Sequence, residues 1–163
     1  MNIVEKIKNL GWGFFGLIIF GGMLLLASLF IKGGLWLSGI LYPWLVAISI
    51  ITFIICFIVL FPLAIFKKTK GLSAVGFLIA SYIFGATLWV WSFLLAYIFW
   101  GFFGLFIGLF MGGIGVVPIA IIASVFKGEW GIFGQLILVI AITFATKYIA
   151  AYLIEDAGHN KLG

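Results

Sequence analysis

The sequence predicts an all-α fold, a polytopic bundle of about five transmembrane helices in a single integral membrane domain that occupies residues 1–163. The chain is 66% hydrophobic and only 8% charged, whereas soluble domains are about 45–50% apolar and about 25% charged. A chain this short cannot hide so much apolar surface in a soluble core. Its few charges also separate long uncharged runs, as expected of membrane spans.

The first helix is expected to cross the membrane after a short lead-in. Residues 1–11 predict an amphipathic helix in the interface, because Ile3, Val4, Ile7 and Leu10 share one helical face. The uncharged run 12–31 follows and predicts the first span. It is too long for the apolar region of a signal peptide, so we expect it to stay in the protein as an anchor.

The next uncharged run covers residues 35–66 and is too long for one crossing. As a single helix it would measure about 48 Å, against a hydrocarbon thickness of about 30 Å. Pro43 favours a break, because proline lacks a backbone donor and clashes with the preceding turn. We therefore expect an interfacial turn or short helix at 35–42 and the second span at 43–66.

The lysine-rich segment 67–71 predicts a loop, and the uncharged run 72–126 that follows it is long enough for two crossings. A turn at Trp100 and Gly101 would divide this run into a third span at 72–99 and a fourth at 102–126. The last span is expected at 132–154, before a polar tail at 155–163. If the segment 101–115 is re-entrant instead, four spans are the alternative count.

The lysines predict the orientation. With five spans, six lysines fall on one side of the membrane: Lys6, Lys8, Lys67, Lys68, Lys70 and Lys127. Lys32 and Lys161 fall on the other side. Because lysine is enriched on the cytoplasmic side, we expect a cytoplasmic N-terminus and an external tail. Composition favours a bacterial inner membrane.

Glycines recur along the expected fourth span at spacings of three and four residues. On a helix they form a stripe roughly 80° wide, with phenylalanines opposite. They are Gly101, Gly104, Gly108, Gly112 and Gly115. Small residues of the third span form a second stripe: Ala74, Ser81, Gly85, Ser92 and Ala96. Such glycine-zipper faces favour close helix contact, either within one chain or around the axis of an oligomer.

Polar residues within the spans are few. Gln135, Thr143 and Thr146 on the last span could join helices by hydrogen bonds or line a polar path. Lys147 is expected to extend to the headgroups, because its aliphatic stem can lie along apolar surface. Glu155, Asp156 and His159 supply at most three metal ligands on a tail, and we expect neither a metal site nor a cofactor there.

The sequence therefore predicts a membrane protein that is not an enzyme. It contains no nucleophile paired with a base and no phosphate-binding loop. The lysines form no nucleic-acid-binding patch, and no span carries the acidic residue of a proton relay. We expect a homo-oligomeric passive channel, with a scaffold or accessory subunit of a larger membrane complex as the alternative. The expected partners are the lipid bilayer and either a second copy or a larger membrane protein.

Overall fold

A computed structural model of the chain describes the backbone of residues 3–66 and 69–159 and the side chains of residues 15–66 and 69–156. All regular secondary structure in these ranges is helical. The chain forms two compact units, residues 1–36 and 37–163. The first unit is helical throughout its described part, and its described side chains are mostly exposed. The expected lead-in at 1–11 is helical from Ile3, but its side chains lie outside the described ones.

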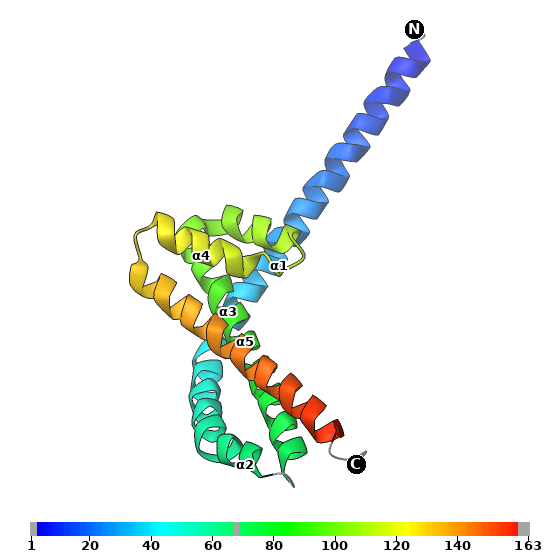
Figure 1. Cartoon of the computed structure of the whole chain (residues 1–163). Coiled ribbons are helices and arrows are strands. Elements are labelled where there is room, and N and C mark those ends of the chain that lie inside the picture. The colour runs from blue at the N-terminus through cyan, green and yellow to red at the C-terminus, as the bar shows by residue number, and fades with distance from the viewer. Residues whose placement is uncertain (1–2, 67–68, 160–163) are drawn as a thin grey trace. The chain divides into compact units, whose positions relative to one another are not determined.

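Six helical elements follow one another along the described part of the chain (Figure 1). They are α1 (Ile3–Ile55), the π-helix η1 (Cys56–Leu60), α2 (Phe61–Ile65), α3 (Lys70–Phe110), α4 (Val116–Phe126) and α5 (Trp130–His159). Three stretches are long and apolar enough to cross a membrane: Phe15–Ile65, Lys70–Phe110 and Trp130–Asp156. The all-helical fold is thus confirmed and these stretches are compatible with a membrane location, whereas the count of five spans is not confirmed.

The expected break at Pro43 is wrong, because α1 continues through this residue. Proline removes one backbone donor, but the remaining helix still pairs almost every other N–H and C=O group internally. A non-helical turn would leave several such groups without partners, which lipid penalises strongly. The expected first and second spans therefore lie in one helical element, without the separate interfacial segment at 35–42.

The proline that does alter its helix is Pro62. Just before it, α1 widens into η1, where the Phe61 N–H donates to the Cys56 carbonyl in the five-residue spacing of a π-helix. A proline ring clashes with the carbonyl four residues earlier, and a wider turn relieves that clash. Two side chains then bind carbonyls of this region: Ser73 Oγ donates to Leu60 O at 2.7 Å, and Thr69 Oγ1 donates to Leu63 O at 2.7 Å.

The core of the second unit lies mainly between α3 and α5, which pack against each other more extensively than any other pair of elements. One cluster of buried side chains joins η1, α3 and α5: Cys56, Ala74, Phe77, Ala80, Phe84, Ala150 and Leu153. A second cluster joins α3 to α4 and α5: Leu88, Leu95, Ala120 and Leu136. Small residues occur in both clusters, which lets the helices approach closely.

The expected fourth span, residues 102–126, is not one continuous helix. The backbone leaves helical geometry at Gly101, with φ of 63°, and it turns again at residues 111–115 before α4 begins. Gly112 and Gly113 both adopt positive φ, at 76° and 77°, a conformation that glycine tolerates and other residues resist. The segment 102–126 is therefore a hairpin of two short helices, which we call the short-helix hairpin.

The expected separation of the tail from the lysine loop is also wrong. Lys70, in the first turn of α3, forms an ion pair with Asp156 near the end of α5. These two helix ends therefore lie side by side. The physical reason is that residues 102–126 form the short-helix hairpin and not one long helix, so that α3 and α5 run in opposite directions.

Candidate functional site

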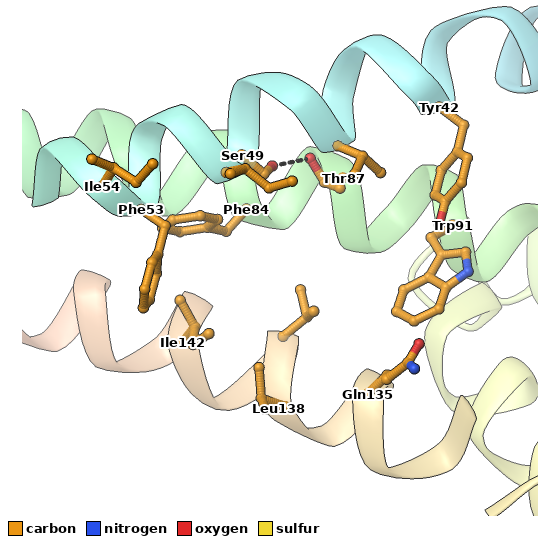
Figure 2. A pocket seen from close by; sticks show the side chains of 13 residues that line it. Tyr42, Ser49, Phe53, Ile54, Phe84, Thr87, Trp91, Gln135, Leu138 and Ile142 are labelled. Carbon is orange, nitrogen blue, oxygen red and sulfur yellow. Dashed lines mark hydrogen bonds between the residues drawn. The ribbon is translucent and has the colours of Figure 1, made fainter. Parts of the chain in front are cut away.

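A cavity of about 350 Å³ lies within the second unit, between α1, α3 and α5 (Figure 2). α1 contributes Tyr42, Val46, Ser49, Ile50, Phe53 and Ile54 to its walls. α3 contributes Phe84, Thr87 and Trp91, and α5 contributes Gln135, Leu138, Val139 and Ile142. This volume lies within the range of about 300–1,000 Å³ that is usual for small-molecule sites.

One hydrogen bond connects α1 to α3 at the wall of the cavity. Ser49 Oγ and Thr87 Oγ1 lie 2.7 Å apart (Figure 2). Either hydroxyl can donate in this pair, and the Thr87 hydroxyl also lies 2.9 Å from Ile83 O of its own helix. Two partly buried hydroxyls thus satisfy each other and fix the side of α1 that faces α3.

Bulky side chains separate α1 from α5 along the cavity. Phe53 and Ile54 of α1 face Leu138 and Ile142 of α5 across it (Figure 2). Branched and aromatic side chains keep helix axes farther apart than small residues do. The α3–α5 contact differs in containing alanines, Ala74, Ala80 and Ala150, among its buried side chains.

The two ends of the cavity differ in polarity. Tyr42, Trp91 and Gln135 lie at one end, and Phe53, Ile54 and Ile142 lie toward the other (Figure 2). The Tyr42 and Trp91 rings are 6.4 Å apart between centroids, at 31° to each other. Gln135 is five residues into α5, about 7 Å along its axis. The polar end is thus close to the beginning of α5, and the apolar end is deeper.

Of the three residues expected to line a polar path, only Gln135 reaches the cavity. Thr143 Oγ1 donates to Val139 O at 2.7 Å, and Thr146 Oγ1 donates to Ile142 O at 2.9 Å. Both threonine hydroxyls are therefore occupied by carbonyls of their own helix. The Gln135 amide makes no hydrogen bond to another residue in the described part of the chain.

The small residues of the α3 stripe lie at or near helix contacts. Ala74, Ser81, Ser92 and Ala96 are buried. A Cβ atom added to Gly85 would meet the Thr143 methyl group at 3.7 Å, an ordinary contact distance. Ser81 Oγ donates to Leu78 O at 2.7 Å. Ser92 Oγ is buried and has no hydrogen-bond partner among the described residues.

The glycines of the stripe expected on the fourth span do not share one helix face. Gly101 and Gly112 lie at backbone turns, with open space where a methyl group would point. Gly108 lies where the two short helices meet, since its Cβ would approach Val116 Cα at 3.1 Å. Gly104 and Gly115 are close to side chains of their own segments, those of Trp100 and Met111. The stripe thus serves two turns and one close contact.

The tail residues do not form a metal site in the described part of the chain. No three His, Cys, Asp or Glu side chains there lie close enough to hold a metal ion. Asp156 pairs with Lys70, and the His159 side chain lies outside the described residues. Lys147 of α5 is exposed, as its expected extension to the headgroups requires.

Sequence reasoning did not identify most of the cavity residues. Tyr42 was expected in an interfacial turn, and Ser49 and Thr87 lie singly among apolar residues, with no spacing that links them. Hydroxyl groups in the middle of uncharged runs were the available signal. A search for known relatives adds no identity, because the chain matches no protein-family model, no curated protein and no solved structure.

Proposed function

We propose that this protein is a non-catalytic integral membrane protein that takes up an amphipathic, lipid-like molecule from the bilayer into the cavity between α1, α3 and α5. The observation that carries this proposal is the cavity itself, a mostly apolar space between three helices with the exposed side chain of Gln135 at one end. A bound hydroxyl or carbonyl group would form a hydrogen bond with this amide, and an alkyl chain would fill the apolar remainder of the cavity.

The polarity of the cavity supports a ligand with one polar end and one alkyl chain. Its polar end would meet Gln135 and Tyr42, which lie toward the beginning of α5. The chain would extend past Phe53 and Ile142 toward the middle of the membrane. A lipid in the adjoining leaflet has the same orientation, with its polar group at the interface and its chain inside.

The passive channel expected from the sequence has less support. A pore needs a continuous polar lining, and the hydroxyls of Thr143 and Thr146 are already bonded to their own helix. The glycines proposed to surround an oligomer axis are divided between turns and a contact within the chain. A role as an accessory subunit is compatible with lipid uptake, because neither requires catalysis.

We also propose an orientation for the second unit, in which residues 37–65, α3 and α5 each cross the membrane once. The lysine-rich segment 67–71 and the end of α5 then lie on one side of the membrane. By sequence, this side holds Lys67, Lys68, Lys70 and Lys161, whereas Lys127 lies on the other side. The lysine excess makes the first side cytoplasmic. The composition favours a bacterial inner membrane as the protein's location.

A photoaffinity experiment tests the uptake of lipid-like molecules. The protein, reconstituted in phosphatidylcholine vesicles, is irradiated with a photoactivatable long-chain alcohol, and the labelled peptides are identified. We expect labelling of the α1 and α5 segments that line the cavity and competition by unlabelled alcohol. Gln135→Leu should weaken labelling about threefold to seventeenfold, because a lost intramembrane hydrogen bond is worth about 0.6–1.7 kcal/mol.

A size-matched pair of variants is the control. Val139→Phe places a ring in the cavity and should abolish competition, whereas Ile137→Phe, at an exposed position that does not line the cavity, should not. Uniform labelling of all exposed helix faces, equal in both variants, would refute the proposal. Conductance of purified oligomers in planar bilayers would instead favour the channel.

A further inference from the structure

The short-helix hairpin, residues 102–126, is too short in each arm to cross a membrane. The first arm, 102–110, measures about 13 Å, and α4, with 11 residues, measures about 16 Å, whereas the hydrocarbon core is about 30 Å thick. Both arms are nevertheless apolar, without a single charged residue. These lengths fit one leaflet, which is about 15 Å deep.

The base of the hairpin is closed. The rings of Trp100, just before the first arm, and Phe126, at the end of α4, are 6.3 Å apart between centroids. The chain therefore returns to the place from which it departed. α5 begins four residues later, at Trp130, so that the hairpin joins the end of α3 to the beginning of α5 on a single side.

The tip of the hairpin lies beside an earlier part of α3. The Trp89 indole N–H donates to the Gly113 carbonyl at 2.9 Å. Trp89 precedes Trp100 by 11 residues, or about 17 Å along a helix axis. The hairpin thus runs from the level of Trp100 back toward the level of Trp89, which is the direction into the membrane if α3 spans it.

Several backbone groups of the tip are paired within the protein. The N–H groups of Met111, Gly112 and Gly113 donate to Ile107 O, Leu109 O and Leu109 O, and Gly113 O accepts from Trp89. Non-helical backbone at membrane depth persists only where protein satisfies its polar groups. A turn at the aqueous surface would need no such arrangement, because water would serve as the partner.

We propose that the short-helix hairpin enters one leaflet and returns to the same side, and that its outer face binds the acyl chains of that leaflet. This face carries Phe102, Phe106 and Phe110, whose successive rings lie 6.2 Å and 6.4 Å apart between centroids. Phe110 and Ile114, near the tip, are each 80% exposed. The hairpin contributes no residue to the cavity, so this proposal does not depend on lipid uptake.

Cysteine accessibility and depth measurements test the proposal. In a Cys56→Ala background, Ile114→Cys probes the tip and Lys127→Cys probes the loop after the base; both native residues are exposed. The reconstituted protein is treated on each side with a membrane-impermeant maleimide. A second sample carries a membrane-permeant fluorophore and is quenched by phosphatidylcholine brominated along its acyl chains.

We expect Lys127→Cys to be labelled from one side only, and Ile114→Cys from neither side. Acyl-chain bromines should quench the fluorophore several-fold more strongly at position 114 than at position 127. Maleimide labelling of Ile114→Cys from the side opposite Lys127 would indicate a complete span, and labelling from the same side would indicate a surface location. A tip that is neither labelled nor quenched would be covered by protein. Each of these three results overturns the proposal.

The hydrogen bond at the tip has its own test. Trp89→Phe keeps an aromatic ring but removes the donor to Gly113, and we expect it to reduce quenching at position 114 by moving the tip toward the interface. Trp44→Phe is the control, because Trp44 is exposed. Unchanged quenching in Trp89→Phe would show that this bond does not hold the tip at depth.

Discussion

The contact between α3 and α5 and the gap between α1 and α5 are built from helices of similar apolar character, but one is closed and the other is open. In the first, Ala74 and Ala150 are fully buried. In the second, Phe53 and Ile142 face each other across a cavity of about 350 Å³. Hydropathy does not distinguish the two places. The difference is that alanines lie among the buried residues of the first, whereas no alanine lines the second.

This difference follows from the physics of helix contacts in lipid. Acyl chains solvate a leucine as well as a protein interior does, so that burial alone gives helices little reason to associate. Close approach of backbones over small residues adds dispersion contacts, which large side chains prevent. We call the contact between α3 and α5 the closed region and the gap between α1 and α5 the open region. Larger residues should therefore destabilise the closed region, whereas the open region should accept them.

The largest expected effect is overpacking of the closed region. Ala150→Leu should lower the free energy of unfolding by about 1–3 kcal/mol or more, because the added carbons have no space between α3 and α5. Ala151→Leu is the matched control, since Ala151 is exposed on the same helix and should change stability by less than about 0.5 kcal/mol. Equal losses in SDS-induced unfolding from bicelles would remove the distinction between the two regions.

The comparison also shows how far the sequence predicts this molecule. Composition predicted an all-helical membrane fold, because charge spacing and hydropathy are local properties. That α1 continues through Pro43 could not be predicted from the sequence. The proline costs the helix one hydrogen bond, which favours a break, but a turn in lipid would leave several backbone groups unpaired, which favours a continuous helix. Gly101 was correctly expected at a turn, whereas the second turn at Gly112 and Gly113 was hidden within a regular glycine spacing.

The candidate site was less predictable than the fold. Gln135 was singled out because an amide is rare in an apolar span, and it lines the cavity. Ser49 and Thr87 lie 38 residues apart in the sequence, and no periodicity connects them. Their meeting depends on how α1 is placed against α3, which is a tertiary property. Single hydroxyls in apolar spans therefore need a structure before they can be paired.

The next largest effect on stability is expected from the Ser49–Thr87 hydrogen bond, which joins α1 to α3 at the wall of the cavity. Ser49→Ala and Thr87→Val each remove one hydroxyl of the pair that joins α1 to α3. A double-mutant cycle should give a coupling of about 0.6 kcal/mol, the average for hydrogen bonds between membrane helices. The cycle is needed because Thr87 also donates to Ile83 O. A coupling of zero would mean that the two hydroxyls do not hold α1 in place.

A comparable or smaller energy is expected at the charged end of the closed region. The Lys70–Asp156 pair is partly exposed, and such pairs contribute about 0.2–1 kcal/mol after screening by water and salt. The pair also reports geometry: Lys70→Cys with Asp156→Cys, in a Cys56→Ala background, should be joined by a short bifunctional maleimide. Lys127→Cys with Asp156→Cys should not, because our proposed orientation puts these residues on opposite sides. The reverse pattern would restore a full crossing between α3 and α5.

The smallest effect on stability is expected where the open region is filled. Val46 is a half-buried residue of α1 that lines the cavity, so Val46→Phe adds an aromatic ring where space already exists. Overpacking costs energy only when neighbours must shift, and here the ring can replace whatever occupies the cavity. We therefore expect a change of less than about 0.5 kcal/mol, together with loss of photolabelling by the long-chain alcohol. A destabilisation as large as that of Ala150→Leu would mean that the cavity closes in the membrane, and with it the difference between the two regions would disappear.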